Sequence, residues 1–317
     1  MIDTNTFLTT IYVMADDFCQ SYAPLQKQLA SQPGVRAALS AAEVITLGLF
    51  SQWQRFRSER DFYRFATSQL KDAFPKLPHR TQFNRQFRRL YDVLIAFFHY
   101  HLATLQQWGS YDWRCEVLDL TAVATRCAQR RGNGWMPGQA RRGWSSRLKW
   151  FEGFHLLSAV NPQGIITGFG LSGGNTKEVH MAHALLEARW YQYPRLECAG
   201  NPAAGFYITD NGFEGKHWHR QWYHEFGAAV LALPKSSNRI QWSRPWRRWM
   251  VHIRQIIESV HEKLHHTFGL ERERPHTISG LMTRVAARIC LHNICIGINI
   301  VRDREPMRFA DLLEWKS

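Results

Sequence analysis

Closely spaced cysteine pairs and long uninterrupted apolar runs are both missing from this 317-residue sequence. Its six cysteines include no C-x-x-C pair, which argues against a disulfide framework and against a cysteine-rich zinc site. The apolar stretch at residues 278–301 is interrupted by charged and polar side chains, so we expect a core helix and not a membrane span. The stretch at residues 7–15 has no basic residue before it and two acids after it, which is unlike a signal peptide. These features predict a cytoplasmic protein with reduced thiols and no membrane partner.

Acidic residues are absent from two long windows. Residues 120–151 contain seven basic residues and no acid, and residues 226–257 contain six basic residues and no acid. The whole chain has 40 basic residues against 26 acids, so these windows account for most of the net charge of +14. One such run is explained by a solvated charged face, but two favour a polyanion, because each phosphate neutralised by Arg or Lys releases counterions. The candidate contacts to double-stranded DNA in these windows are Arg126, Arg130, Arg131, Arg141, Arg142, Arg147, Lys149, Arg244, Arg247, Arg248 and Arg254.

The first 110 residues show helical patterns throughout. Ser40 and Glu43 form a predicted capping box, and a second helix is expected to open at Ser58. A basic helix then follows near residue 81 and carries Arg85, Arg88 and Arg89. Such a series of short helices fits a helix-turn-helix DNA reader, and it fits a helical bundle with a solvated arginine face equally well. We therefore predict an all-helical domain over residues 1–110 that binds DNA.

The periodicity changes at about residue 111. Strands are expected at residues 115–125, 153–160 and 164–171, with a compact turn between the second and third. A helix over residues 176–189, the strand ending at Asp210, a helix over residues 214–225 and a strand over residues 228–233 come next. This order is that of a ribonuclease H-like α/β fold, a mixed sheet flanked by helices. We predict that residues 111–317 form this second domain.

Three carboxylates can converge on that sheet. Asp119 ends one apolar run and Asp210 ends another, where ligands collect at the carboxyl ends of strands in open α/β sheets. Glu258 lies on an amphipathic helix four residues after Arg254, so a structural ion pair between these two is the simpler alternative. Hard cations such as Mg²⁺ bind oxygen ligands, and two such ions can promote an in-line displacement at a phosphodiester. The three acids therefore form a candidate Mg²⁺ site in which Mn²⁺ can substitute.

Several blocks in this order resemble the signature blocks of bacterial insertion-sequence DDE transposases. They are VLDLT at 117–121, GFHL at 153–156, GGNT at 173–176, TDNGF at 209–213, RQIIE at 254–258 and ARICLHN at 287–293. LSAAEV at 39–44 and FNR at 83–85 resemble the helical leader of that family. The resemblance covers most of the chain, and the order and spacing of the blocks are more specific than any block alone.

The resemblance implies a catalytic triad of Asp119, Asp210 and Glu258 in a ribonuclease H-like domain. It also implies metal-dependent cleavage at inverted terminal repeats and strand transfer into target DNA, the cut-and-paste reaction. We expect the protein to act as a homodimer on DNA, associated with the bacterial nucleoid. The sequence departs from many relatives at two positions around the last acid, where Val251 replaces a tyrosine and His265 replaces a lysine. Contacts to the transposon end are therefore expected to differ, or this copy to be impaired.

Two other functions compete with this one. Residues 261–265 read HEKLH, a formal zinc-protease motif in which His261 and His265 would bind zinc and Glu262 would act as base. Lys263 places a charge within the motif, and no third ligand is evident, so this reading is the weaker. A transposase-derived DNA-binding protein without activity is the other alternative, although all three acids are retained. Trp242, Trp246 and Trp249 lie among arginines and fit either base stacking or a patch that covers the sheet.

Overall fold

The computed structural model describes residues 1–31, 37–53, 55–108, 113–127, 135–191, 202–234, 238–239, 241–271 and 276–315. These residues form two compact units. Unit 1 comprises residues 1–101, 266–273 and 279–317, and unit 2 comprises residues 102–265 and 274–278. The predicted division at residue 110 lies near the first boundary, but by packing the last long helix belongs with unit 1 and not with the sheet.

Unit 1 is helical apart from a short parallel pair of strands, β1 (Ile2–Asp3) and β8 (Leu313–Glu314). Its helices are α1 (Thr4–Ser21), α2 (Ala23–Ser31), α3 (Ala41–Phe50), α4 (Glu59–Gln69), α5 (Arg80–Arg89), the first part of α6 (Tyr91–Trp108), and α10 (Ile278–Val301). The expected capping box at the start of α3 is present, because Ser40 and Glu43 each bond the other's backbone N–H.

Helix α10 has the length and composition of a membrane-spanning helix, yet 83% of its most apolar window is buried inside the structure. This agrees with the expected core helix. Its charged residues are paired internally: Arg288 donates from Nε to the carbonyl oxygen of Phe268 at 2.8 Å. Arg284 forms an ion pair with Glu59 of α4, and burial lowers the pKa of Arg284 to about 10.

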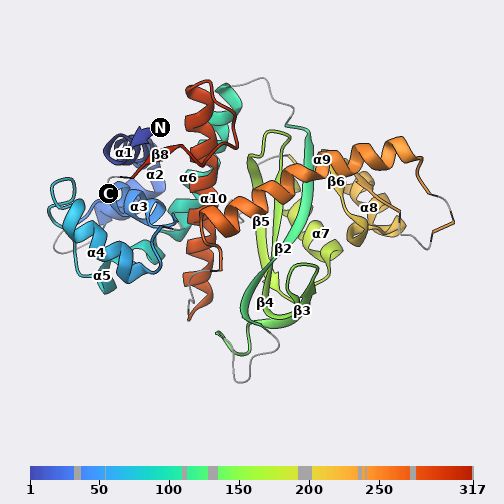
Figure 1. Ribbon diagram of the computed structural model, residues 1–317, viewed down its shortest axis with the longest axis horizontal. Helices are drawn as coiled ribbons and strands as arrows, with labels where there is room; N and C mark the ends of the chain where they lie inside the picture. The colour runs from blue at the N-terminus through green and yellow to red at the C-terminus, as the bar shows by residue number, and fades with distance from the viewer. Residues whose placement is uncertain are drawn as a thin grey trace. The chain divides into compact units, whose positions relative to one another are not determined.

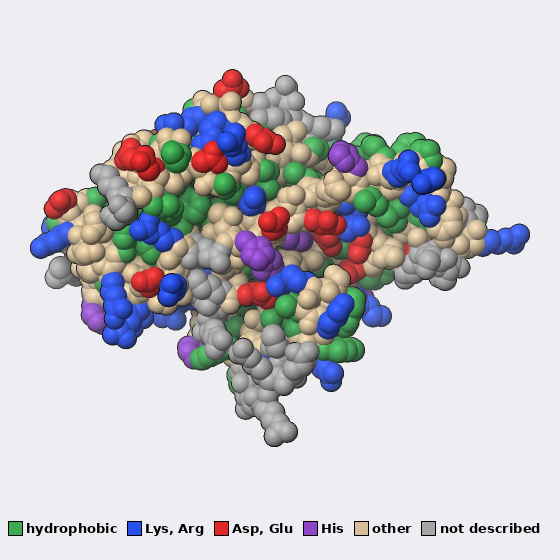
Figure 2. Space-filling model, in the orientation of Figure 1, with side chains coloured by type: hydrophobic (Ala, Val, Ile, Leu, Met, Phe, Trp, Pro, Cys, Tyr) green, Lys and Arg blue, Asp and Glu red, His purple; other side chains and the backbone are tan. Residues whose placement is uncertain are grey.

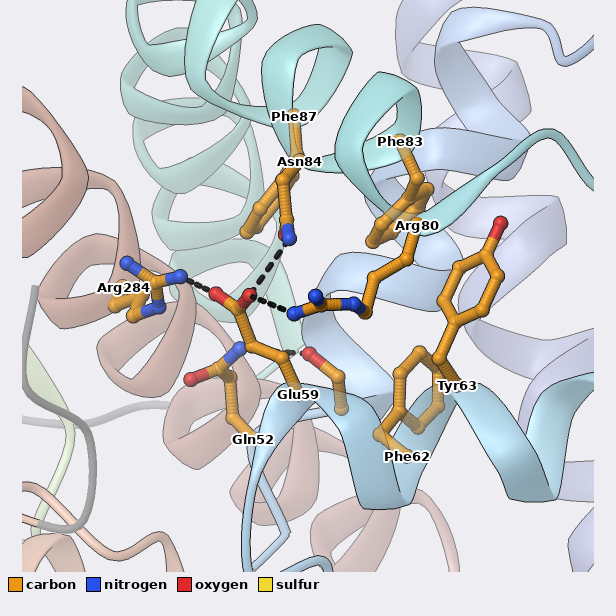
Figure 3. A pocket seen from close by; sticks show the side chains of 10 residues that line it. Gln52, Glu59, Phe62, Tyr63, Arg80, Phe83, Asn84, Phe87 and Arg284 are labelled. Carbon is orange, nitrogen blue, oxygen red and sulfur yellow. Dashed lines mark hydrogen bonds and ion pairs between the residues drawn. The ribbon is translucent and has the colours of Figure 1, made fainter.

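Glu59 also joins α5 to this group (Figure 3). Asn84 donates to its carboxylate at 2.6 Å, and Arg80 lies 3.9 Å from it. The same helix buries Phe83 and Phe87 and exposes Arg85, Arg88 and Arg89. An amphipathic helix of this kind suits both a DNA reader and a bundle with a solvated face, so the predicted DNA contact of α5 stays a prediction.

Unit 2 is built on a six-stranded mixed sheet (Figure 1). Its strands are β2 (Cys115–Cys127), β3 (Arg141–Ser145), β4 (Lys149–Val160), β5 (Ile166–Gly173), β6 (Gly205–Thr209) and β7 (Ala228–Ala232). Strands β3 and β5 both pair with β4, and the order continues through β2 and β6 to β7. The pairs of β4 are antiparallel, whereas β2, β6 and β7 run parallel to one another.

The remaining elements of unit 2 are α7 (Glu178–Trp190), η1 (Asn211–Phe213), α8 (Lys216–Phe226), α9 (Arg244–Glu262) and a π-helical turn η2 (Lys263–Thr267), whose end reaches unit 1. This confirms the expected mixed sheet with flanking helices. Every predicted strand is present within a few residues of its expected bounds. Strand β3 was not predicted, because RRGWS has no apolar alternation.

Alternation along β2 separates two faces of the sheet. Leu118 packs in an apolar cluster with Leu185 of α7, Tyr207 of β6 and Trp222 of α8. The next residue, Asp119, points to the other face, which α9 crosses (Figure 1). The sheet thus has one apolar face under α7 and α8 and one face that carries acids under α9.

A buried ion pair ties α7 to the sheet. Glu116 of β2 and Arg189 of α7 are both nearly inaccessible and bond each other. Arg189 also donates to Tyr207 Oη at 3.2 Å and to Thr167 Oγ1 at 3.3 Å, which satisfies the guanidinium. Burial raises the pKa of Tyr207 to about 12.

We predict that Arg189→Met lowers the free energy of unfolding by about 3 to 5 kcal/mol, because it leaves the Glu116 carboxylate buried without its partner. Urea unfolding followed by circular dichroism measures this change. Arg220→Met, on the exposed side of α8, is the matched control and should change stability by less than about 0.5 kcal/mol. The double variant Glu116→Leu/Arg189→Met should recover much of the loss, and a single-variant loss below about 1 kcal/mol would contradict the assignment.

Candidate active site

Parallel pairing of β2 and β6 positions two of the predicted acids. The register pairs Glu116 with Tyr207 and Val117 with Ile208. Continued by two residues on each strand, it places Asp119 opposite Asp210, where neighbouring strands are about 4.8 Å apart. The residues just before them, Leu118 and Thr209, are both buried, so alternation along each strand turns both carboxylates to the α9 side.

Asp119 is held in a crowded and charged environment. Its Oδ1 accepts from the N–H of Leu120 at 2.8 Å, and its Oδ2 accepts from Nη2 of Arg254 at 3.2 Å. Burial raises the pKa of Asp119 to about 6, and the negative charge of Asp210 adds to this rise. Arg254 acts in the opposite direction but does not cancel the two effects. The ionised form of Asp119 is therefore destabilised by burial and by Asp210 to an extent that Arg254 does not offset.

Asp210 begins a tight turn. It is the N-cap of η1, and its Oδ1 accepts from the N–H of Gly212 at 2.8 Å. A side chain at Gly212 would collide with the carboxylate of Glu178, which comes from the start of α7. Glycine at this position lets the Glu178 carboxylate lie directly against the turn. Glu178 is an acid beside this turn that the sequence analysis did not identify, because nothing in its local pattern distinguishes it from an acid in the first turn of any helix.

Glu258 lies apart from the two aspartates. It is on α9 with an exposed side chain, four residues and thus about 6 Å along the helix axis from Arg254. Within the described ranges, no three His, Cys, Asp or Glu side chains are grouped closely enough to hold a metal ion. The structure therefore brings together Asp119, Asp210 and Arg254, and the predicted third ligand stays a prediction. Arg254 forms its ion pair with Asp119 and not with Glu258, which was the simpler alternative.

The two histidines of the formal zinc motif lie at the end of α9 and in the turn η2 that follows it. His265, in the π-helical turn, has Nε2 2.9 Å from Oγ1 of Thr121, two residues beyond Asp119. His261 is buried, and burial together with the neighbouring His265 and Arg147 lowers its pKa to about 3. Glu262 is exposed on the other side of the helix. His265 is thus engaged with β2 and His261 is buried, and the described residues supply no third zinc ligand, so the geometry gives the zinc-protease interpretation no support.

A family model described as Transposase DDE domain matches residues 117–294, which is more than half of the chain. The chain belongs to this family. No curated protein matches it. The matched span begins two residues before Asp119 and includes Asp210, Arg254 and Glu258.

Within unit 2 of this DDE transposase, the basic residues expected to contact DNA lie in three places. In α9, Arg244, Arg247 and Arg248 are exposed beside Trp246 and Trp249, and Figure 2 shows basic and hydrophobic side chains gathered together at this end of the helix. Arg141, Arg142 and Lys149 are exposed on the β3–β4 hairpin, whereas Arg147 in its turn donates to the carbonyl oxygen of Ala122 at 2.9 Å. Arg126 is paired with Glu152 at 2.6 Å, and Arg130 and Arg131 lie outside the described residues.

The repulsion between the two aspartates predicts a pH-dependent gain in stability for Asp210→Asn. The pKa of Asp119 is higher in the folded protein than its ordinary value of 3.8, so the folded state loses stability as pH rises through about 6 and Asp119 ionises. Without the charge of Asp210, the loss is smaller. Without added metal, we expect the free energy of unfolding of Asp210→Asn to be about 1 kcal/mol higher than that of the wild type at pH 8. At pH 5 the two proteins should differ little.

Urea unfolding in EDTA at both pH values measures this difference. Asparagine keeps the oxygen that accepts from Gly212, so the turn is preserved. The exposed acid Asp72 provides the matched control, and Asp72→Asn should show no such pH-dependent gain. A gain of equal size at pH 5 and pH 8 would rule out charge repulsion as the cause.

Proposed function

We propose that this DDE transposase cleaves DNA at the inverted terminal repeats of a mobile element and transfers the ends into target DNA. The observation that carries the proposal is the proximity of Asp119, within β2, to Asp210, which directly follows the parallel strand β6, inside a matched DDE domain. An acid whose pKa is raised by burial and by a neighbouring carboxylate, as that of Asp119 is, is costly to the folded protein, and such acids are typical of catalytic centres.

The two aspartates suit a divalent cation. Hard oxygen donors match Mg²⁺, or Mn²⁺ in its place, and a cation would relieve the repulsion that raises the pKa of Asp119. Bound there, the metal would supply an activated water and charge stabilisation for phosphodiester cleavage. Arg254 forms an ion pair with Asp119 when no metal is bound, and this ion pair would break when the carboxylate of Asp119 binds the metal. Glu258, one turn further along α9, would then turn inward and act as the third metal ligand.

Double-stranded DNA is the proposed substrate. The exposed arginines at the start of α9 and on the β3–β4 hairpin would contact phosphates, and those of α5 would contribute from unit 1. Each end of an element needs an active site, so we propose that two copies of the chain act together as a homodimer. The proposed location is the bacterial cytoplasm, at the nucleoid. An inactive DNA-binding descendant is the alternative, and whether the wild-type protein nicks a terminal-repeat duplex decides between them.

The first test concerns the acids. Asp119→Asn and Asp210→Asn should abolish Mg²⁺-dependent nicking of a labelled terminal-repeat duplex, while duplex binding in EDTA persists, because the phosphate contacts are elsewhere. Glu258→Gln keeps the size of the side chain and removes its charge, and should reduce nicking by at least ~10²-fold.

Glu262→Gln is the matched control on the same helix and should cost little. Wild-type protein that binds the duplex but does not nick it with either metal would favour the inactive alternative. Nicking that survives in Glu258→Gln would show that Glu258 is not part of the active site. Stoichiometric bound zinc, together with an inactive Glu262→Gln variant, would favour the zinc-protease interpretation.

The second test concerns the arginines of α9. Duplex affinity should fall steeply with salt, because the contacts are to phosphates. Replacing Arg244, Arg247 and Arg248 by Gln should reduce the slope of log affinity against log salt by up to ~3, since each lost phosphate contact lowers it by about 0.9. Fluorescence anisotropy over a salt series measures the slope. Three exposed lysines of unit 1, Lys27, Lys71 and Lys76, provide a charge-matched control whose replacement by Gln should leave the slope unchanged.

A further inference from the structure

Two tryptophans are exposed side by side on the β3–β4 hairpin. Trp144 and Trp150 are directly paired across the two strands, and each side chain is 53% exposed. Large aromatic side chains normally bury most of their surface, and an exposed pair on one ribbon indicates a binding surface. Figure 2 shows hydrophobic and basic side chains exposed together in this region.

Each indole ring has a cation over it. The guanidinium carbon of Arg142 lies 4.7 Å from the ring centroid of Trp150, and Nζ of Lys149 lies 5.9 Å from that of Trp144. The acid next along β4, Glu152, is neutralised by Arg126 at 2.6 Å. The sequence from residue 141 to 151 contains no acid. This surface therefore combines flat aromatic faces with uncompensated positive charge.

The hairpin is folded back toward the acids. A side chain at Gly143 would collide with the backbone of Gly174 and the ring of Phe151, so glycine permits the close approach of β3 to the end of β5. The turn beyond β3 brings Arg147 to the carbonyl oxygen of Ala122 at 2.9 Å. Ala122 is three residues along β2 from Asp119, about 10 Å at strand spacing. Through the side chain of Arg147, the hairpin turn thus contacts the same strand that carries Asp119.

We propose that Trp144 and Trp150 form a stacking platform for unpaired bases of the DNA strand next to the cleavage site. Arg142 and Lys149 contact the flanking phosphates. Aromatic faces interleaved with cations are the composition of single-strand sites, because every base offers a flat face and every nucleotide a charge. Paired and stacked bases within a duplex do not offer those faces, so the ligand is an unpaired tail and not an intact duplex. This inference rests on the proposed function, of which it specifies one part.

The test compares a blunt duplex with the same duplex bearing a four-nucleotide tail that contains 2-aminopurine. Binding of the full-length protein is measured in EDTA by anisotropy, and stacking by quenching of the 2-aminopurine fluorescence. We expect Trp144→Ala/Trp150→Ala to lose at least ~5-fold in affinity for the tailed duplex, and up to ~150-fold for one stacked base, together with the quenching. Affinity for the blunt duplex should stay within about twofold, and Trp144→Phe/Trp150→Phe should retain both signals.

Trp190→Ala, which removes an equally exposed indole from the end of α7, is the matched control and should behave as the wild type. Equal losses on blunt and tailed duplexes, or no loss on either, would overturn the platform while leaving the proposed function in place. Loss of quenching in Trp246→Ala/Trp249→Ala, but not in the hairpin variant, would show that the bases stack on α9. That result would also overturn the proposed platform. Wild-type protein that binds neither duplex would defeat the proposed function itself.

Discussion

Parallel pairing of β2 with β6 is the constraint on which the rest of the site depends. It places Asp119 and Asp210 opposite each other although 90 residues separate them in the chain. The register alone does not determine to which face of the sheet the two carboxylates point. The apolar cluster around Leu118 and Tyr207 does so, because a shift of one residue would expose that cluster and bury both acids. Stability of the sheet and geometry of the site are therefore fixed by the same alternation.

Helix α9 compensates for the charge that this pairing creates. Ile257 and Val260 bury its apolar stripe, and the helical repeat then places Arg254 over the sheet, 3.2 Å from Asp119. A guanidinium in this position is a fixed cation that the protein supplies to its own acids. The pKa of Asp119 still rises to about 6, so the compensation is partial. An additional cation, such as the divalent metal proposed for this site, would lower that pKa further.

The sequence predicted what depends on local pattern. Apolar runs ending in acids identified Asp119 and Asp210, and their strands are where they were expected. Partners that depend on tertiary packing were not predictable: Arg254 had an equally good local partner in Glu258, and only the position of α9 over β2 selects Asp119. The β3–β4 hairpin was missed because its outward face carries Trp144 and Trp150 where a polar residue is usual. Its departure from the strand pattern is what makes it a candidate binding surface.

The two acid-free windows, residues 120–151 and 226–257, place positive charge near the two aspartates. Carboxylates that bind a cation also repel the phosphates of a DNA strand, so cations must lie close enough to offset that repulsion. Arg147 reaches β2 three residues from Asp119, and Arg247 precedes Arg254 by seven residues on α9. Both distances are about 10 Å along their elements, close to the screening length at ~0.1 M salt. An acid inserted within either window would weaken the positive field that the proposed DNA contacts require.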